Sequence, residues 1–546
     1  MNDFEMDTNS GSDRKYLIML AGVLLLSMLF RFYNLDIVPK WDFDEGYNMR
    51  YSYDLLNGEI LWFSIKYTFI PHPPLFFMAY ALVIKFFGVG ISTIRILVAL
   101  CGVATTIFVY MAGKEMFGQK VGVLAAFIYA VTPEVVFWNR IGYANNLFIM
   151  LSAMALYFTY RYSKTLNEKH LYLGCLSAGL SVITEYTGLF NVAAMAIFLY
   201  IYRRGKTLKI VLLSLTPMIL VFAFMLYHSP EYFIFDLKYQ TQRFLSPIKI
   251  VLFLFAMLLA LKMRKRVADF YKPITETMSQ DMLIYTSLVS LGILITTSER
   301  DFWYATTYIM LMGLFGICLK PSFLIEGEKE RRLVLLFFLL NLASILLLNR
   351  ADHMTMVIYP HAILGIAAML SNIYEKSVEE LPWILRRFRL KPSRRVIYIA
   401  TFHSIFIALC FSTYMFLSGN ISTESPDRDY AVAEYINQRT GEGDLILTYS
   451  WMFPLIKNAR VSLLTQSLAY EGHPIAYYSG DFPKERFAFN TSYTRAKFIV
   501  ASNGTTEWLL NQTGLNETVR YIDSWDKTYV EGFLVYSNPS YNNSMG

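Results

Sequence analysis

The residues best suited to acid/base chemistry are two neighbouring carboxylates near the N-terminus. Asp44 and Glu45 lie in the segment Trp41-Asp42-Phe43-Asp44-Glu45-Gly46-Tyr47. One carboxylate of such a pair can stay ionised and take a proton from an acceptor, while its neighbour positions a substrate or a cation. A solvated acidic turn is the alternative for the pair taken alone. The segment is therefore the first candidate for a reactive site.

A histidine follows in a rigid setting. His72 lies between Pro71 and Pro73, whose rings restrict the backbone on both sides. A histidine placed in this way can donate to a phosphate or tune a nearby carboxylate, although it also fits the start of a helix. A second histidine at metal-ligand spacing is missing from the sequence around it, which disfavours a zinc site.

Three arginines lie between apolar segments of the chain. They are Arg140, Arg300 within the triplet Glu299-Arg300-Asp301, and Arg350. The planar fork of arginine binds phosphate through paired N–H groups, so a phosphate-bearing substrate would find its ligands among these residues. The alternative is that each arginine merely extends from the membrane interface toward water.

The composition predicts that membrane-spanning helices position these groups. Of 546 residues, 55% are hydrophobic and 17% are charged, whereas about 25% are charged in a typical soluble chain. The net charge, 49 − 42 = +7, is better explained by basic cytoplasmic loops than by nucleic-acid binding, and no nucleic-acid partner is expected. The four cysteines lie in apolar stretches, which excludes a disulfide framework in the polar C-terminal region.

Apolar stretches of suitable length predict about thirteen spanning helices, in a multi-pass protein of the cell membrane with a cytoplasmic N-terminus. Basic clusters fall on the cytoplasmic side under this threading. The spans are expected at Tyr16–Tyr33, Ile94–Met111, Val121–Trp138, Leu147–Tyr160, Leu171–Thr184, Leu189–Tyr202, Val211–Tyr227, Ile248–Leu261, Met282–Thr296, Tyr304–Leu319, Leu333–Leu348, Thr355–Leu370 and Ile397–Leu417.

The region 34–92 is expected to be an external loop because it is polar and broken by prolines. Within it, Pro74–Phe87 suits a helix lying in the membrane interface. Treating that segment as a further span would place three basic clusters outside, against the positive-inside bias. These clusters are Arg203–Lys209, Lys262–Arg266 and Arg386–Arg395.

The chain is expected to divide into a transmembrane domain, 1–417, and a small extracellular α/β domain, 418–546. The second region contains acceptor triplets for asparagine glycosylation, whose use stays open. They start at Asn420, Asn490, Asn503, Asn511, Asn516 and Asn542. Its periodicity predicts helices at Asp429–Arg439 and Thr505–Asn511 and strands at Asp444–Tyr449, Lys497–Ala501 and Gly532–Tyr536. A lid or docking module fits this region better than a catalytic one.

The order of these features resembles the polyprenyl-phosphate-sugar-dependent GT-C glycosyltransferases. The resemblance rests on the Asp-Glu pair after the first span, His72-Pro73-Pro74-Leu75, the odd span count and the external C-terminal domain. Protein O-mannosyltransferases carry a similar Asp-Glu and His-Pro-Pro-Leu, and lipid A aminoarabinose transferases share the general architecture. The likeness covers mainly residues 16 to about 200, with Arg350 and Tyr359-Pro360 as a weaker later feature.

The resemblance implies an α-helical polytopic membrane enzyme of GT-C type that moves a sugar from a dolichyl- or other polyprenyl-phosphate donor. The acceptor would be a protein, a glycan or a lipid at the external face of the bilayer. It implies inverting displacement, with Asp44 as the base and Glu45 as its partner. The implied ligands of the donor phosphate are His72, Arg140, Arg300 and Arg350, and the implied acceptor- or sugar-lining residues are Tyr47 and Glu185.

Two departures from the family pattern bear on these roles. Asn145-Asn146 stand where the family often has an acidic residue, and Glu185 in Thr184–Gly188 stands where it usually has lysine. Mannosyltransferases of this type need no cofactor, whereas related oligosaccharyltransferases need a divalent metal.

Three alternatives remain open. An oligosaccharyltransferase-like enzyme would depend on a metal. A transporter or flippase with a binding ectodomain would bury charges at mid-membrane in related halves. A structural envelope protein would not need the acidic pair, the histidine and the arginines together.

Overall fold

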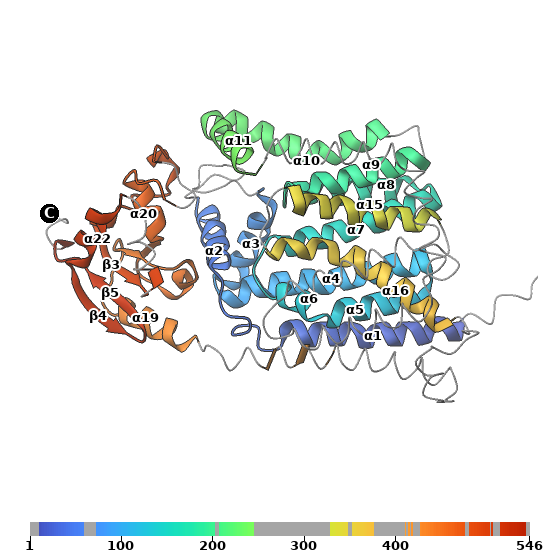
Figure 1. Ribbon diagram of the computed structural model, residues 1–546, viewed down its shortest axis with the longest axis horizontal. Coiled ribbons are helices and arrows are strands. Elements are labelled where there is room, and N and C mark those ends of the chain that lie inside the picture. Colours follow the sequence, from blue (N-terminus) through green and yellow to red (C-terminus); the bar gives the residue numbers. More distant parts are fainter. Residues whose placement is uncertain are drawn as a thin grey trace, which may run out of the picture.

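The fold is taken from a computed structural model, which describes residues 10–58, 73–202, 207–244, 328–347, 352–375, 410, 413–414, 417–418, 426–475, 480–502, 504–505 and 514–541. A set of roughly aligned helices forms one end of the molecule and a mixed α/β region the other (Figure 1). The predicted spans Ile248–Leu261, Met282–Thr296 and Tyr304–Leu319, and nearly all of Ile397–Leu417, lie outside the described residues.

Apolar helices build the first end. They are α1 (Ser10–Phe32), α4 (Ile91–Phe117), α5 (Gln119–Val131), α6 (Pro133–Trp138), α7 (Asn145–Thr165), α8 (Glu168–Val182), α9 (Gly188–Tyr202), α10 (Thr207–His228), α15 (Glu328–Leu347) and α16 (Tyr359–Glu375). In the described part of the chain, three segments are long and apolar enough to cross a membrane: Arg14–Phe32, Ile91–Phe117 and Thr207–His228. The predicted multi-pass membrane character is confirmed at this level.

The predicted span Val121–Trp138 is wrong in one respect, because it consists of two helices. Helix α5 ends at Val131 and α6 begins at Pro133. Thr132 between them is extended, with φ −69° and ψ 122°. Proline disfavours the helical conformation of the residue before it, which accounts for the break.

The described parts of the region 34–92, residues 34–58 and 73–92, contain two helices that precede α4. They are α2 (Phe43–Leu56) and α3 (Leu75–Phe87), and only α3 was expected. A capping box starts α2: the Asp42 side chain accepts from the Asp44 N–H, and the Glu45 side chain accepts from the Asp42 N–H. This exchange satisfies two of the N–H groups that a helix start leaves without partners.

The C-terminal region contains a five-stranded mixed sheet in the order β2-β1-β3-β5-β4. β1 is parallel to β2 and β3, whereas β5 is antiparallel to β3 and β4. The strands are β1 (Leu445–Leu447), β2 (Arg460–Ser462), β3 (Ala496–Ala501), β4 (Asp526–Val530) and β5 (Phe533–Ser537), with helices α19 (Asp427–Asn437), α20 (Leu464–Tyr470) and α22 (Asn516–Asp523).

This region matches most of the pattern predicted for it. The helix expected at Asp429–Arg439 and the strands expected at Asp444–Tyr449, Lys497–Ala501 and Gly532–Tyr536 are confirmed as α19, β1, β3 and β5. The helix expected at Thr505–Asn511 lies almost wholly outside the described residues. Strands β2 and β4 were not predicted.

Helix α2 lies between the aligned helices and the sheet (Figure 1). One core cluster joins Met49 of α2 and Phe77 of α3 to Ile446 and Val461 of the sheet. Arg50 of α2 also donates from Nη1 to the Val461 carbonyl at 2.9 Å. The sheet region therefore packs against α2, the helix that carries the acidic pair.

Candidate functional site

The acidic segment forms the first turn of α2. Asp42 precedes the helix, and its Oδ1 accepts from the Asp44 N–H at 2.9 Å and from the Tyr143 hydroxyl at 2.8 Å. The Asp44 side chain is exposed. A carboxylate in the first turn of a helix is also favoured electrostatically by the positive end of the helix dipole. Asp44 is thus an exposed carboxylate at the start of α2.

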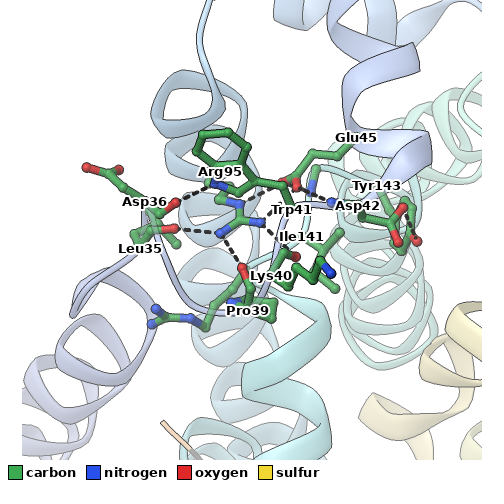
Figure 2. A network of polar contacts seen from close by, with 12 residues as sticks. Leu35, Asp36, Pro39, Lys40, Trp41, Asp42, Glu45, Arg95, Ile141 and Tyr143 are labelled. Atoms are coloured by element: carbon green, nitrogen blue, oxygen red, sulfur yellow. Dashed lines mark hydrogen bonds and ion pairs between the residues drawn. The ribbon is translucent and has the colours of Figure 1, made fainter. Parts of the chain in front are cut away.

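Glu45 has the opposite surroundings. Its carboxylate forms a two-bond ion pair with Arg95, with Nε–Oε1 and Nη2–Oε2 distances of 2.8 Å (Figure 2). Both side chains are 0% exposed. Oε1 also accepts from the Gly142 N–H at 2.9 Å. Glu45 is therefore buried and paired with Arg95, whereas its neighbour Asp44 is exposed, and its role as the partner of Asp44 stays a prediction.

The remaining N–H groups of Arg95 hold the chain before α2. Nη1 donates to the carbonyls of Leu35 and Pro39 at 2.9 and 2.8 Å, and Nη2 donates to that of Lys40 at 3.3 Å. The Trp41 indole N–H donates to the Asp36 carbonyl at 2.7 Å in the same loop (Figure 2). Sequence reasoning missed Arg95. The available signal was a charge close to the start of an apolar helix, where charges are costly unless paired.

Arg140 points into the protein. Its guanidinium donates to the carbonyl of Phe30 at 2.6 Å, to that of Tyr33 at 2.6 Å, and twice to that of Val38 at 2.8 and 3.0 Å. Burial, with the nearby charges of Arg95 and Arg31, lowers the pKa of Arg140 to about 9. The guanidinium therefore holds the chain between α1 and α2 through these carbonyls, and its role as a phosphate ligand stays a prediction.

The Tyr143 hydroxyl lies close to the carboxylates of the acidic turn. Burial raises the pKa of its hydroxyl, and the negative charges of Asp42 and Asp44 raise it further. The sign is unambiguous for a phenol, because both effects disfavour the phenolate. Tyr143 consequently remains a hydrogen-bond donor to Asp42 at neutral pH.

The other predicted site residues are more dispersed. Tyr47 is buried within α2, and Glu185 is buried in the turn between α8 and α9. The Leu75 N–H donates to the Ile183 carbonyl at 3.0 Å, so the start of α3 lies against this turn. His72, Arg300 and Arg350 lie outside the described residues. Across the described ranges, no group of three or more His, Cys, Asp or Glu side chains is arranged to hold a metal ion.

Residues 71–230 match the model of a family described as dolichyl-phosphate-mannose-protein mannosyltransferase. An uncharacterized protein of Aquifex aeolicus is 28% identical over 200 residues, which are 35% of this chain. The match spans 38% of that relative's own length. The matched family segment contains α3 to α10 and, with them, Arg95 and Arg140 of the site.

Two solved structures share the fold. ArnT from Cupriavidus metallidurans, bound to undecaprenyl phosphate, has a TM-score of 0.61 at 12% identity, covering 96% of this chain and 97% of that one. The oligosaccharyltransferase AglB from Archaeoglobus fulgidus, in complex with an inhibitory peptide and a dolichol-phosphate, has a TM-score of 0.56 at 12% identity, covering 97% of this chain and 75% of that one.

The matched family and the proteins of the same fold are glycosyltransferases, and the predicted resemblance to GT-C glycosyltransferases is confirmed. The family match covers residues 71–230, and the predicted enzyme class stays a prediction for the chain as a whole.

Proposed function

We propose that the chain transfers a sugar from a polyprenyl-phosphate-linked donor to an acceptor hydroxyl at the external face of a membrane. The observation that carries the proposal is the contrast within the acidic pair: Asp44 is exposed at the start of α2, while Glu45 is fixed by Arg95. A base must be accessible to the acceptor, and the exposed position of Asp44 supports this role for it. The family match over residues 71–230 and the ligands of the two solved structures support the donor class.

In the proposed reaction Asp44 takes the proton of the acceptor hydroxyl. The acceptor oxygen attacks the anomeric carbon, the bond from that carbon to the phosphate oxygen breaks, and the polyprenyl phosphate departs with both bonding electrons. Attack opposite the leaving group inverts the anomeric configuration. The negative charge that grows on the phosphate needs fixed positive groups, and His72, Arg300 and Arg350 stay predictions for this role.

The framework of arginines and carbonyls gives Asp44 a fixed position. Arg95 holds the loop before α2 through Leu35, Pro39 and Lys40, and Arg140 holds the same loop through Val38. A base held in one position needs little rearrangement to reach the reacting hydroxyl, which is a general source of rate enhancement. The Glu45–Arg95 pair therefore acts on the reaction through Asp44.

The test is transfer from radiolabelled polyprenyl-phosphate monosaccharides in membranes containing the wild type or Asp44→Asn. We expect label to reach an acceptor with the wild type and the rate to fall about 100-fold or more with Asp44→Asn, since general-base catalysis contributes roughly 100- to 10,000-fold. A chelator arm separates metal-free transfer from an oligosaccharyltransferase-like reaction. Equal transfer by Asp44→Asn would remove Asp44 as the base.

A further inference from the structure

A pocket of about 230 Å³ lies between the loop that precedes α2 and the C-terminal sheet. Its aromatic wall consists of Trp41 from the loop and Tyr449, Trp451 and Phe533 from the sheet region. The volume is below the ~300–1,000 Å³ of pockets for drug-sized molecules, so it suits a single ring and not an extended chain.

The two central rings of this wall are held in place before any ligand arrives. Tyr449 and Trp451 stack with 4.6 Å between ring centroids and 13° between planes. The Trp451 indole N–H donates to Asp429 Oδ1 at 3.0 Å, and the Tyr449 hydroxyl accepts from the Ser502 N–H at 2.8 Å. Rings fixed in this way lose little conformational freedom when a ligand packs on them.

Charged groups of both signs accompany the rings. Lys40, Arg428 and Asp429 also line the pocket. Arg428 is steadied by a bond from its Nε to the Glu531 carbonyl at 3.0 Å and lies 5.3 Å from the centre of the Phe533 ring. The pocket thus combines fixed apolar faces with both hydrogen-bond donors and a hydrogen-bond acceptor.

This combination matches one ligand chemistry. A sugar ring has apolar C–H faces that pack on aromatic rings and hydroxyls that donate and accept at its edge. A purely apolar group would leave the charged side chains without new partners, at a cost in desolvation. Lys40 and Arg428 outnumber Asp429 in the lining and would attract a phosphate, but a phosphate would leave the aromatic faces of the pocket without a packing partner.

The pocket adjoins the acidic turn of α2. Ser450, between the two stacked residues, donates from its Oγ to the Phe43 carbonyl in the first turn of α2. A Cβ on Gly46 would meet the backbone of Ser450 and Trp451. Trp41, in the pocket wall, precedes Asp42 directly. A ligand in the pocket therefore lies beside the turn that presents Asp44.

We propose that this pocket binds a sugar ring of a saccharide acceptor, so that the acceptor of the transfer is a glycan. The inference rests on the proposed function and adds the acceptor class to it. The sheet region then has a direct part in the reaction, because it supplies most of the residues of the acceptor subsite and contacts α2 beside it.

The test uses the purified full-length chain and ligand-observed NMR titration with methyl mannoside, methyl glucoside, methyl galactoside and N-acetylglucosamine. We expect at least one glycoside to bind the wild type, and Trp451→Ala to weaken that binding about tenfold, or roughly 1.4 kcal/mol. Arg428→Gln, on the exposed rim, should weaken it about fivefold without the risk of a misfolded core. The matched control is Tyr529→Ala on β4, a tyrosine that is 68% exposed and outside the pocket.

Several outcomes would overturn the proposal. They are the absence of glycoside binding to the wild type, unchanged binding by both Trp451→Ala and Arg428→Gln, and Trp451-dependent binding of a Ser/Thr peptide in place of the glycosides. Asp44→Asn separates this proposal from the proposed function. It should bind glycosides like the wild type and transfer sugar about 100-fold or more slowly. Equal transfer by Asp44→Asn beside Trp451-dependent binding would refute Asp44 as the base and leave the pocket assignment standing.

Discussion

Glu45 and Asp44 follow one another in the chain, yet they meet different dielectric environments. Glu45 and Arg95 are both 0% exposed and bonded through two N–H groups at 2.8 Å. Asp44 is exposed. A buried charge is tolerated only with its partner, whereas an exposed charge is solvated by water. Substitutions at the two positions should therefore have separable effects.

We expect Glu45→Gln to lower the free energy of unfolding by about 3 kcal/mol, because it leaves Arg95 buried without its counter-charge. Asp44→Asn should change it by less than about 1 kcal/mol, since Asp44 is exposed at a helix start. Thermal unfolding in detergent compares the two purified variants. Equal destabilisation by both would contradict the different roles assigned to these carboxylates.

At the scale of elements, the site depends on close contact between the turn 139–144, α2 and α4. Gly142 lies where these meet: its N–H donates to Glu45 Oε1, and its carbonyl accepts from Asn48 Nδ2 at 2.8 Å. A Cβ at this position would lie 2.7 Å from Ile94 Cδ1 and 2.9 Å from Glu45 Cγ. A side chain here would push on the Glu45–Arg95 pair itself.

We expect Gly142→Ala to destabilise the protein by about 1–3 kcal/mol, the range for an overpacked site, and to reduce sugar transfer by displacing the acidic turn. Gly22→Ala in α1 is the control, because a Cβ there has nothing within 4 Å. Melting temperature and transfer rate are measured for both variants. Wild-type behaviour of Gly142→Ala in both measurements would show that this packing does not position the turn.

At the scale of the whole molecule, α2 is one of the elements that connect the apolar helices to the C-terminal sheet. It contacts the Ser450–Trp451 backbone through Gly46, and Arg50 donates to the Val461 carbonyl. Arg50 also lies 4.9 Å from the centre of the Phe453 ring. Helix α2 thus both contacts the sheet region and carries the acidic turn.

We expect Gly46→Ala to loosen the sheet region from α2, because its Cβ would collide with backbone atoms, which have less freedom to move than the ends of side chains. If the free energy of detaching the sheet region from α2 falls by about 1.4 kcal/mol, trypsin should cleave within residues 426–541 about tenfold faster. Gly441→Ala, in open space on the sheet side, is the matched control. Equal cleavage rates for the two variants would show that the contact at Gly46 does not hold the sheet region against α2.

Much of the architecture could be predicted from local patterns. Apolar stretches predicted α4, α7, α8, α9 and α10 close to their observed bounds, since hydropathy over about 20 residues is a property of a continuous segment. Helix α2 escaped prediction because its residues are polar on average and are buried only by tertiary packing against α3, α4 and the sheet region. The residues D-x-x-E at 42–45 carried a capping-box signal that was available in the sequence.

By itself, the sequence determined the membrane character of the chain, the mixed α/β nature of its C-terminal region and the acidic pair as the candidate for chemistry. These depend on composition and on neighbours along the chain. Only the tertiary structure decided which carboxylate is accessible, that Arg140 binds carbonyls, and that aromatic residues of the sheet meet the acidic turn. Such outcomes depend on burial and pairing between residues far apart in sequence, such as Glu45 with Arg95 and Phe43 with Ser450, which local pattern cannot encode.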